Sequence, residues 1–115
     1  MYVMHSRYTL RHYLTSDGKD VILSWMKGLR DRRAVTRIIA CLDRARHGNF
    51  GDHKAVAEGV WELRIEYGPG YRVYYCLDGE YIVLLLCGGD KSTQKIDIKN
   101  AVAYKKDYDR RADNA

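Results

Sequence analysis

Two arginines, Arg64 and Arg72, flank a glycine-rich turn in the stretch WELRIEYGPGYRVYY, residues 61–75. Apolar and polar residues alternate on both sides of the turn, which predicts the two strands of an antiparallel hairpin. The register that keeps the apolar side chains together pairs Leu63 with Val73, and it therefore places Arg64 opposite Arg72. Like charges at directly opposite positions destabilise a sheet, so the pair requires an explanation.

The same register places Glu62 opposite Tyr74, on the outer face of the hairpin beside the two arginines. Guanidiniums about 5 Å apart suit a phosphate group, and they also suit a transition state that carries extra negative charge. The alternative is a solvated ladder of ion pairs, in which Glu62 and Glu66 neutralise the arginines. The residue pattern supports the two interpretations equally.

The rest of the pattern predicts an α+β domain with the element order β-α-α-β-β-β-α. We expect strands at 6–14, 60–66, 70–77 and 80–87, and helices at 19–30, 32–47 and 92–109. The polar stretch 49–59 is predicted to be a loop, and the tail after residue 109 is predicted to fray. The elements would form one domain over residues 1–115, a mostly antiparallel twisted sheet with a helical hairpin packed on one face.

Each helix of the predicted hairpin has one apolar stripe. The stripes are Ile22, Trp25, Met26 and Leu29 in the first helix and Val35, Ile38, Ile39 and Leu42 in the second. Ser16 or Asp17 suits the N-cap of the first helix and Asp31 that of the second. The polar face of the second helix carries five arginines, which indicate a footprint for RNA or a solvated surface: Arg32, Arg33, Arg37, Arg44 and Arg46.

The composition limits the class of protein. Lys and Arg number 20 against 15 Asp and Glu, and the resulting charge of +5 favours a polyanion or an acidic protein as partner. No apolar run reaches 18 residues and the N-terminus lacks a signal-peptide pattern, so we expect a cytoplasmic protein with no membrane partner. The three cysteines match no close-set metal pair, and we expect neither a metal nor a cofactor.

Two blocks, GVWELRIEYGPGYRVYY and VLLLCGGDKSTQKIDIKNA, closely resemble the RelE/ParE toxin superfamily, and within it the phage-derived, HigB-like branch of addiction module killer proteins. The resemblance covers residues 17–105. It implies a compact sheet with two helices packed on it and a concave face that takes RNA. It also implies a toxin that cleaves mRNA on the ribosome, and a cognate antitoxin, usually a helix-turn-helix protein, through which operator DNA would be bound.

The resemblance carries roles to individual residues. Arg64 and Arg72 would hold the scissile phosphate, and Lys91 would neutralise charge or protonate the leaving oxygen. Glu62 or Asp97 would be the base, although Asp97 stands where well-studied members have a tyrosine. A carboxylate beside two arginines has a lowered pKa and is a weak base near neutrality. No metal is needed if the RNA 2′-hydroxyl attacks its own 3′-phosphate.

Four further residues are candidate substrate contacts. Tyr74 could stack on a base, Tyr67 lies in the turn, and Arg37 lies on the basic helix. His53 is expected in the loop before the sheet, from which it could reach the outer face. Two rival functions remain open, since fold alone does not decide function. One is a non-catalytic, ParE-like toxin that binds DNA gyrase, and the other is a binding module without activity.

Overall fold

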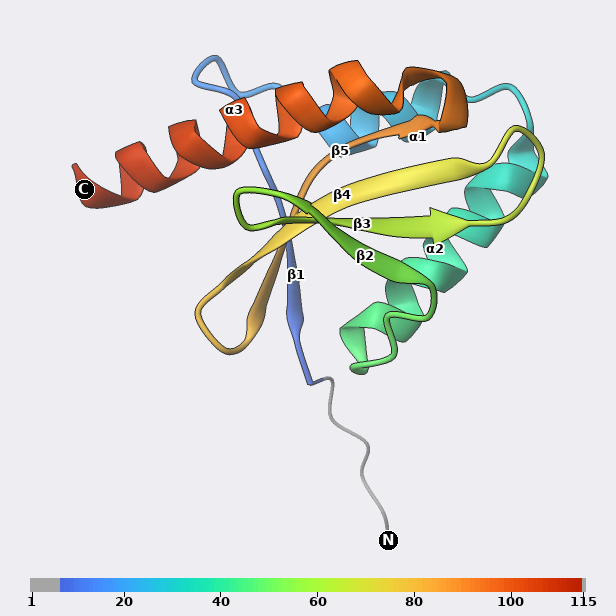
Figure 1. Cartoon of the computed structure of the whole chain (residues 1–115), viewed down its shortest axis with the longest axis horizontal. Coiled ribbons are helices and arrows are strands. Elements are labelled where there is room, and N and C mark those ends of the chain that lie inside the picture. The colour runs from blue at the N-terminus through green and yellow to red at the C-terminus, as the bar shows by residue number, and fades with distance from the viewer. Residues whose placement is uncertain (1–6, 115) are drawn as a thin grey trace, which may run out of the picture.

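The computed structural model describes residues 7–114, and helices cover both faces of one central sheet (Figure 1). The elements are β1 (Thr9–His12), α1 (Val21–Gly28), α2 (Arg32–Arg46), β2 (His53–Ala57), β3 (Val60–Ile65), β4 (Tyr71–Asp78), β5 (Ile82–Asp90), a short 3-10 helix η1 (Lys91–Thr93) and α3 (Gln94–Asp113). The strand order is β1-β5-β4-β3-β2, and every neighbouring pair is antiparallel except β1 with β5. The predicted α+β class and mostly antiparallel sheet are confirmed.

The hairpin of β3 and β4 has the predicted register. Leu63 pairs with Val73, Arg64 pairs with Arg72, and Glu62 lies opposite Tyr74. Alternation alone fixed this result, because a slip of one residue would turn Arg64 into the apolar core.

Several predicted boundaries are wrong. Residues 53–57 form the edge strand β2 instead of the predicted loop. The sheet therefore has five strands, one more than predicted. β2 pairs only with β3 and its first three residues are exposed, so it lacks the apolar pattern that marks an inner strand. Helix α3 continues to Asp113, past the predicted fraying point at 109. The first strand is shorter than 6–14, and residue 6 lies outside the described residues.

Helices α1 and α2 cover one face of the sheet, as predicted. This face is hereafter called the hairpin face, after the helical hairpin that α1 and α2 form. Their side chains join those of the strands in one apolar cluster that includes Ile22, Ile38, Leu63 and Val73. Asp31 caps α2 by accepting from two backbone N–H groups, but Asp20, not Ser16 or Asp17, caps α1. The predicted stripe of α2 is wrong at Ile39, which is 53% exposed. None of the helices in residues 7–114 has the length and hydropathy that crossing a bilayer requires.

Helix α3 lies across the opposite face, hereafter the α3 face, and builds a second apolar cluster there (Figure 1). Because both faces are covered, β4 is buried at six consecutive positions, from Tyr71 to Cys76. The apolar strand β5 is also covered on both faces, as its sequence predicts: Leu85 belongs to one cluster and Leu84 to the other.

The glycine pair in LLLCGGDKS lets a helix approach each face of β5. A Cβ atom on Gly88 would lie 2.2 Å from a ring carbon of Trp25 in α1. A Cβ atom on Gly89, which faces the other way, would lie 1.8 Å from a carboxylate oxygen of Asp97 in α3. The two glycines therefore position α1 and the first turn of α3 close to the sheet.

Candidate active site

Glu62 is the centre of a buried polar cluster on the α3 face. Its side chain is only 1% exposed, and it accepts hydrogen bonds from Arg64 Nε at 2.9 Å, from Tyr74 Oη at 3.2 Å and from Gln94 Nε2 at 3.0 Å. Burial pushes the pKa of Glu62 up, but the hydrogen bonds from Arg64, Gln94 and Tyr74 outweigh it and hold that pKa below its usual value. Glu62 is therefore a carboxylate at neutral pH.

Arg72 lies beside this carboxylate and is also nearly buried, at 5% exposure. Its Nη1 donates to the carbonyl oxygen of Tyr71 at 3.1 Å, and its Nε lies 3.6 Å from Glu62 Oε1, too far for a good hydrogen bond. The buried Nε has no hydrogen-bond partner among the described residues. Arg72 thus carries a positive charge that the buried Glu62 and, at 3.9 Å, the exposed Glu66 neutralise without fully satisfying its donors.

The expectation of a solvent-facing site is wrong for three of the four candidate residues on strands β3 and β4. Glu62, Arg72 and Tyr74 do lie on one face of the sheet, as predicted, but α3 covers that face and leaves Tyr74 with no exposed surface. Tyr74 therefore offers no ring to a base, and its hydroxyl binds Glu62 instead. Burial, and then the charge of Glu62, raises the pKa of Tyr74. Arg64 reaches solvent, with 30% of its side chain exposed.

Lys91 lies next to Arg72 at the turn between β3 and β4. A Cβ atom added to Gly70 would lie 3.4 Å from Arg72 Nη1 and 3.6 Å from Lys91 Cβ, so both residues lie close to this glycine. Gly70 also has a positive φ of 82°, which favours glycine. Lys91 is exposed whereas Arg72 is buried, so Lys91 is the more accessible of these two cations.

Asp97 forms no ion pair with either arginine, but its carboxylate lies against Gly89, the residue of β5 that pairs with Arg72. It accepts a hydrogen bond from the Thr93 hydroxyl, and no ion pair joins it to a described residue. Burial raises its pKa, which the Thr93 bond only partly offsets. The structure thus brings Glu62, Arg64 and Arg72 together, while Lys91 and Asp97 lie at the margin of this cluster, beside Gly70 and Gly89.

The other candidate substrate contacts divide between two places. The guanidinium of Arg37 lies over the Tyr67 ring at 4.9 Å, beside the tip of the hairpin. His53 is on β2 rather than in a loop, and it pairs with Leu63. Its side chain therefore points to the hairpin face, where it lies 5.6 Å from the Trp61 ring. The expectation that His53 reaches the face of Glu62 is wrong.

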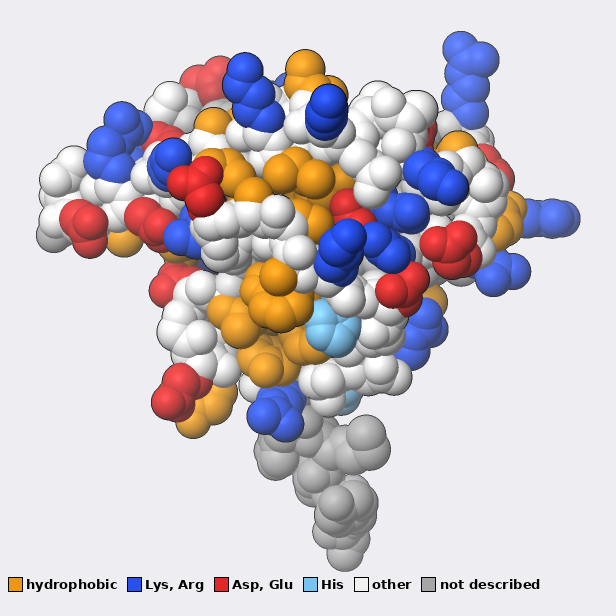
Figure 2. Space-filling view, viewed as in Figure 1, with side chains coloured by type: hydrophobic (Ala, Val, Ile, Leu, Met, Phe, Trp, Pro, Cys, Tyr) orange, Lys and Arg blue, Asp and Glu red, His pale blue; other side chains and the backbone are white. Residues whose placement is uncertain are grey.

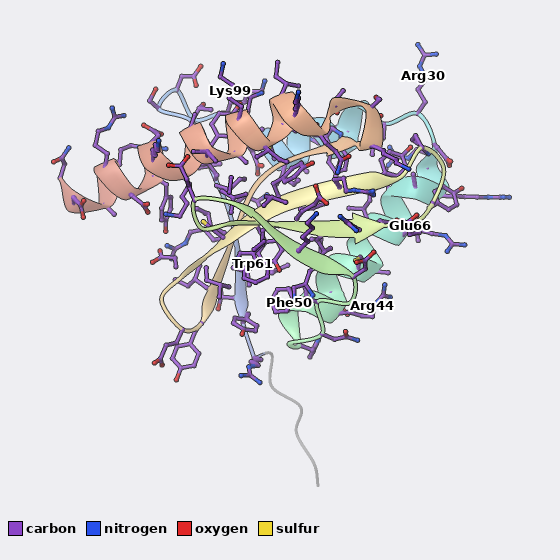
Figure 3. All side chains as sticks on the ribbon, in the orientation of Figure 1. Arg30, Arg44, Phe50, Trp61, Glu66 and Lys99 are labelled. Carbon is purple, nitrogen blue, oxygen red and sulfur yellow. The ribbon has the colours of Figure 1, made fainter. Side chains whose placement is uncertain are left out.

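A groove of about 300 Å³ runs between α2 and the end of β3. Its lining includes three arginines, Arg37, Arg44 and Arg64, together with Thr36 and one acidic residue, Glu66. Figure 3 shows Arg44 and Glu66, which border the groove from α2 and from the hairpin. Figure 2 shows Lys and Arg side chains gathered over this corner of the molecule. Arg64 belongs to both the groove and the Glu62 cluster, although α2 borders the groove from the hairpin face and α3 covers the cluster on the opposite face.

One residue of the site had no signal in the sequence, and another was expected only as a member of a larger set. Gln94 reaches Glu62 from the start of α3, 32 positions along the chain, and no local pattern predicts such a contact. Arg44 is one of five arginines on the polar face of α2, and only the packing of α2 beside β3 selects it for the groove. Among residues 7–114, no three His, Cys, Asp or Glu side chains gather where they could share a metal ion.

The fold and the site define a small α+β domain in which an arginine-lined groove and a buried charge cluster share Arg64. Residues 24–108 match the family described as Phage derived protein Gp49-like (DUF891), and the chain belongs to this family, which is of the RelE/HigB-like toxin type. A protein of Haemophilus influenzae strain Rd, described as uncharacterized, is 53% identical over 78 residues. That match covers 68% of this chain and 79% of the relative.

Proposed function

We propose that this chain is the toxin of a toxin–antitoxin pair and that it cleaves mRNA on the ribosome without a metal ion. The observation that carries the proposal is the placement of two guanidiniums around Glu62, at the end of a groove lined by further arginines. Family membership supports the toxin role and an antitoxin partner. The cleavage chemistry rests on the site.

The groove suits the backbone of a single RNA strand. Neither Arg37 nor Arg44 forms an ion pair with any residue in the described range, so both charges are free to bind phosphates. Glu66 is 75% exposed, and its side chain can move away from an arriving polyanion. A strand in this groove would bring one phosphate to Arg64, where the groove meets the cluster.

In the proposed reaction the 2′-hydroxyl attacks the adjacent phosphorus, which forms a 2′,3′-cyclic phosphate and releases the 5′-oxygen of the next nucleotide. Arg64 would contact the phosphate directly because it is the more exposed of the two arginines. Arg72 would stabilise the developing charge from beneath it. Lys91, exposed beside Arg72, would donate the proton that the leaving oxygen takes up.

Glu62 suits a positioning role better than that of a base. It is buried, it accepts three hydrogen bonds, and its pKa lies below the usual value, so it takes up a proton poorly near neutrality. Its carboxylate would hold Arg64 and Arg72 in place. Asp97, whose pKa is raised by burial, is the better candidate for the base. Alignment of the mRNA by the ribosome would supply further rate through orientation.

One observation favours the rival, a non-catalytic toxin that binds DNA gyrase. Arg72 and Glu62 have almost no exposed surface, which suits a structural cluster as well as a catalytic one. Such a toxin would act through its surface residues alone.

The test compares two arginine substitutions after induction in cells, with the 5′ ends of mRNA mapped. Arg64→Ala should remove growth arrest and lower cleavage about 10²–10³-fold, the usual cost of losing one charge-stabilising donor. Arg30→Ala is the matched control, because Arg30 is exposed and points away from the site in Figure 3. Intact mRNA together with a DNA-damage response would establish the gyrase rival and refute cleavage.

A further inference from the structure

The sheet has an open edge along β2. The N–H of Arg64 donates to the carbonyl oxygen of Asp52 at 2.9 Å, so residues 52 and 54 bond to β3 in the antiparallel ladder. The backbone N–H and C=O groups of His53 and Ala55 therefore point away from β3. No backbone hydrogen bond from another described segment reaches them. An open row of this kind is a template for one more strand.

An apolar hollow lies next to this edge on the hairpin face. Its volume is about 160 Å³, and its lining is Phe50, His53, Trp61, Tyr75 and Leu77. The Phe50 and Tyr75 rings stack at 5.3 Å, while Leu77 is 48% exposed. Figure 3 shows Phe50 and Trp61 close together beneath β2. The side chains of His53 and Ala55 point toward this hollow, because they pair with Leu63 and Trp61.

A second hollow, of about 470 Å³, lies next to the same edge on the α3 face. Its floor is apolar and its rim is basic: it is lined by Ala57, Glu58, Lys95, Ile98, Lys99, Val102, Ala103 and Lys106. Glu58 is the one acidic residue of this lining and pairs with Lys106 at 3.5 Å. Lys54 points to this face from β2. Figure 2 shows hydrophobic side chains on both sides of the line that β2 follows in Figure 1.

We propose that β2 receives an extended, acidic segment of a partner protein as a sixth strand of the sheet. Residues opposite Ala55 would place apolar side chains in the aromatic hollow, since cross-strand neighbours share a face. Alternate residues would point toward Lys54, Lys95 and Lys99 and would carry carboxylates. The five residues of β2 match a segment about 17 Å long. The identification of the partner as the antitoxin rests on the proposed toxin function.

The charges favour this occupant over a second copy of the chain. An edge-to-edge pair of β2 strands would bring Lys54 and the lysine rim of one copy against those of the other, and like charges oppose such pairing. Val56 is an extra residue that shifts the register between Ala55 and Ala57. A lysine and a bulge on an edge strand are devices that hinder self-association. With an acidic segment, Lys54 would attract the added strand instead of repelling it.

The test uses the purified chain and a fluorescein-labelled, nine-residue peptide that alternates valine and glutamate, followed by fluorescence anisotropy. Ala55→Pro removes an outward N–H without removing a bond to β3, so it should weaken binding at least tenfold. Lys95→Glu combined with Lys99→Glu should weaken it by a similar factor. Lys19→Glu combined with Lys27→Glu, the same charge change at exposed sites outside the hollow, should leave binding unchanged.

Three outcomes would overturn the proposal. In the first, Ala55→Pro binds the valine–glutamate peptide as tightly as the original chain does and has the same unfolding midpoint. In the second, a valine–lysine peptide binds as tightly as the valine–glutamate peptide. In the third, the chain alone forms a dimer that Ala55→Pro dissociates. Growth arrest and mRNA cleavage by Ala55→Pro are measured in the same cells without a partner. Because Ala55 lies outside the proposed catalytic cluster, arrest by this variant should persist. Loss of peptide binding therefore tests the strand site, and loss of cleavage by Arg64→Ala tests the toxin chemistry.

Discussion

The two faces of the sheet are both covered by helices, yet they are built in different ways. On the hairpin face, side chains with little or no exposed surface are apolar, as at Ile22, Ile38 and Val73. On the α3 face, the described residues include a buried carboxylate and a buried guanidinium, Glu62 and Arg72. One face follows the rule that apolar groups are buried, whereas the other buries charges that must be paired.

The difference extends to the helices themselves. In α3, Ala101 is the fully buried residue of the 20, and polar bonds help to hold the helix on the sheet. Tyr13 donates to Asp107 at 2.6 Å, and Gln94 donates to Glu62 at 3.0 Å. In α2, six of 15 residues are buried. The hairpin face thus depends on packing, and the α3 face depends on polar partners as well.

The largest expected effect comes from removing one charge of the buried pair. Glu62→Ala leaves the buried Arg72 guanidinium with only the exposed Glu66 carboxylate, 3.9 Å away, and it should lower the free energy of unfolding by about 3–5 kcal/mol. Urea denaturation measures this loss. The double substitution Glu62→Leu with Arg72→Met removes both charges and should restore most of the stability while abolishing growth arrest. Failure of the double variant to recover stability would show that the cluster is needed for folding itself.

A loss of stability of intermediate size is expected from alanine at Gly88 or Gly89, adjacent residues that lie against opposite helices. Gly88→Ala forces a methyl group against the Trp25 ring and should cost about 1–3 kcal/mol, as overpacking usually does. Gly89→Ala meets the carboxylate of Asp97, the end of a flexible side chain that can turn aside, and should cost less. Thermal unfolding of the two variants compares them directly. An equal or larger cost at Gly89 would show that the Asp97 side chain does not turn aside.

The smallest expected effect is the acid sensitivity of the α3 face. The pKa of Glu62 is lower in the folded chain than the unfolded value of about 4.3, so the stabilisation from its ionised form is complete above that value. This stabilisation is lost as the pH falls through the lower pKa of the folded chain. Glu62→Gln should therefore be less stable at pH 7, and its stability should decline less steeply as the pH is lowered below about 4. If the unfolding free energies of the two chains changed in parallel with pH, ionised Glu62 would not contribute to the acid sensitivity.

The sequence by itself determined the register of the hairpin and the apolar stripes that seat α1 and most of α2. Both follow from local periodicity, since a period of two or 3.6 states which side chains share a face. The pairing of Arg64 with Arg72 could therefore be predicted without coordinates.

Only the tertiary structure decided that Glu62, Arg72 and Tyr74 are buried on the face that a helix covers. A buried polar residue that is satisfied by distant partners looks, in its local pattern, like an exposed one. Tyr74 and Glu62 alternate as solvent-facing residues do, and their burial depends on α3, which begins about 20 to 30 positions later. The edge strand β2 and the arginine groove have the same origin, because each is formed by elements that only the folded chain brings side by side.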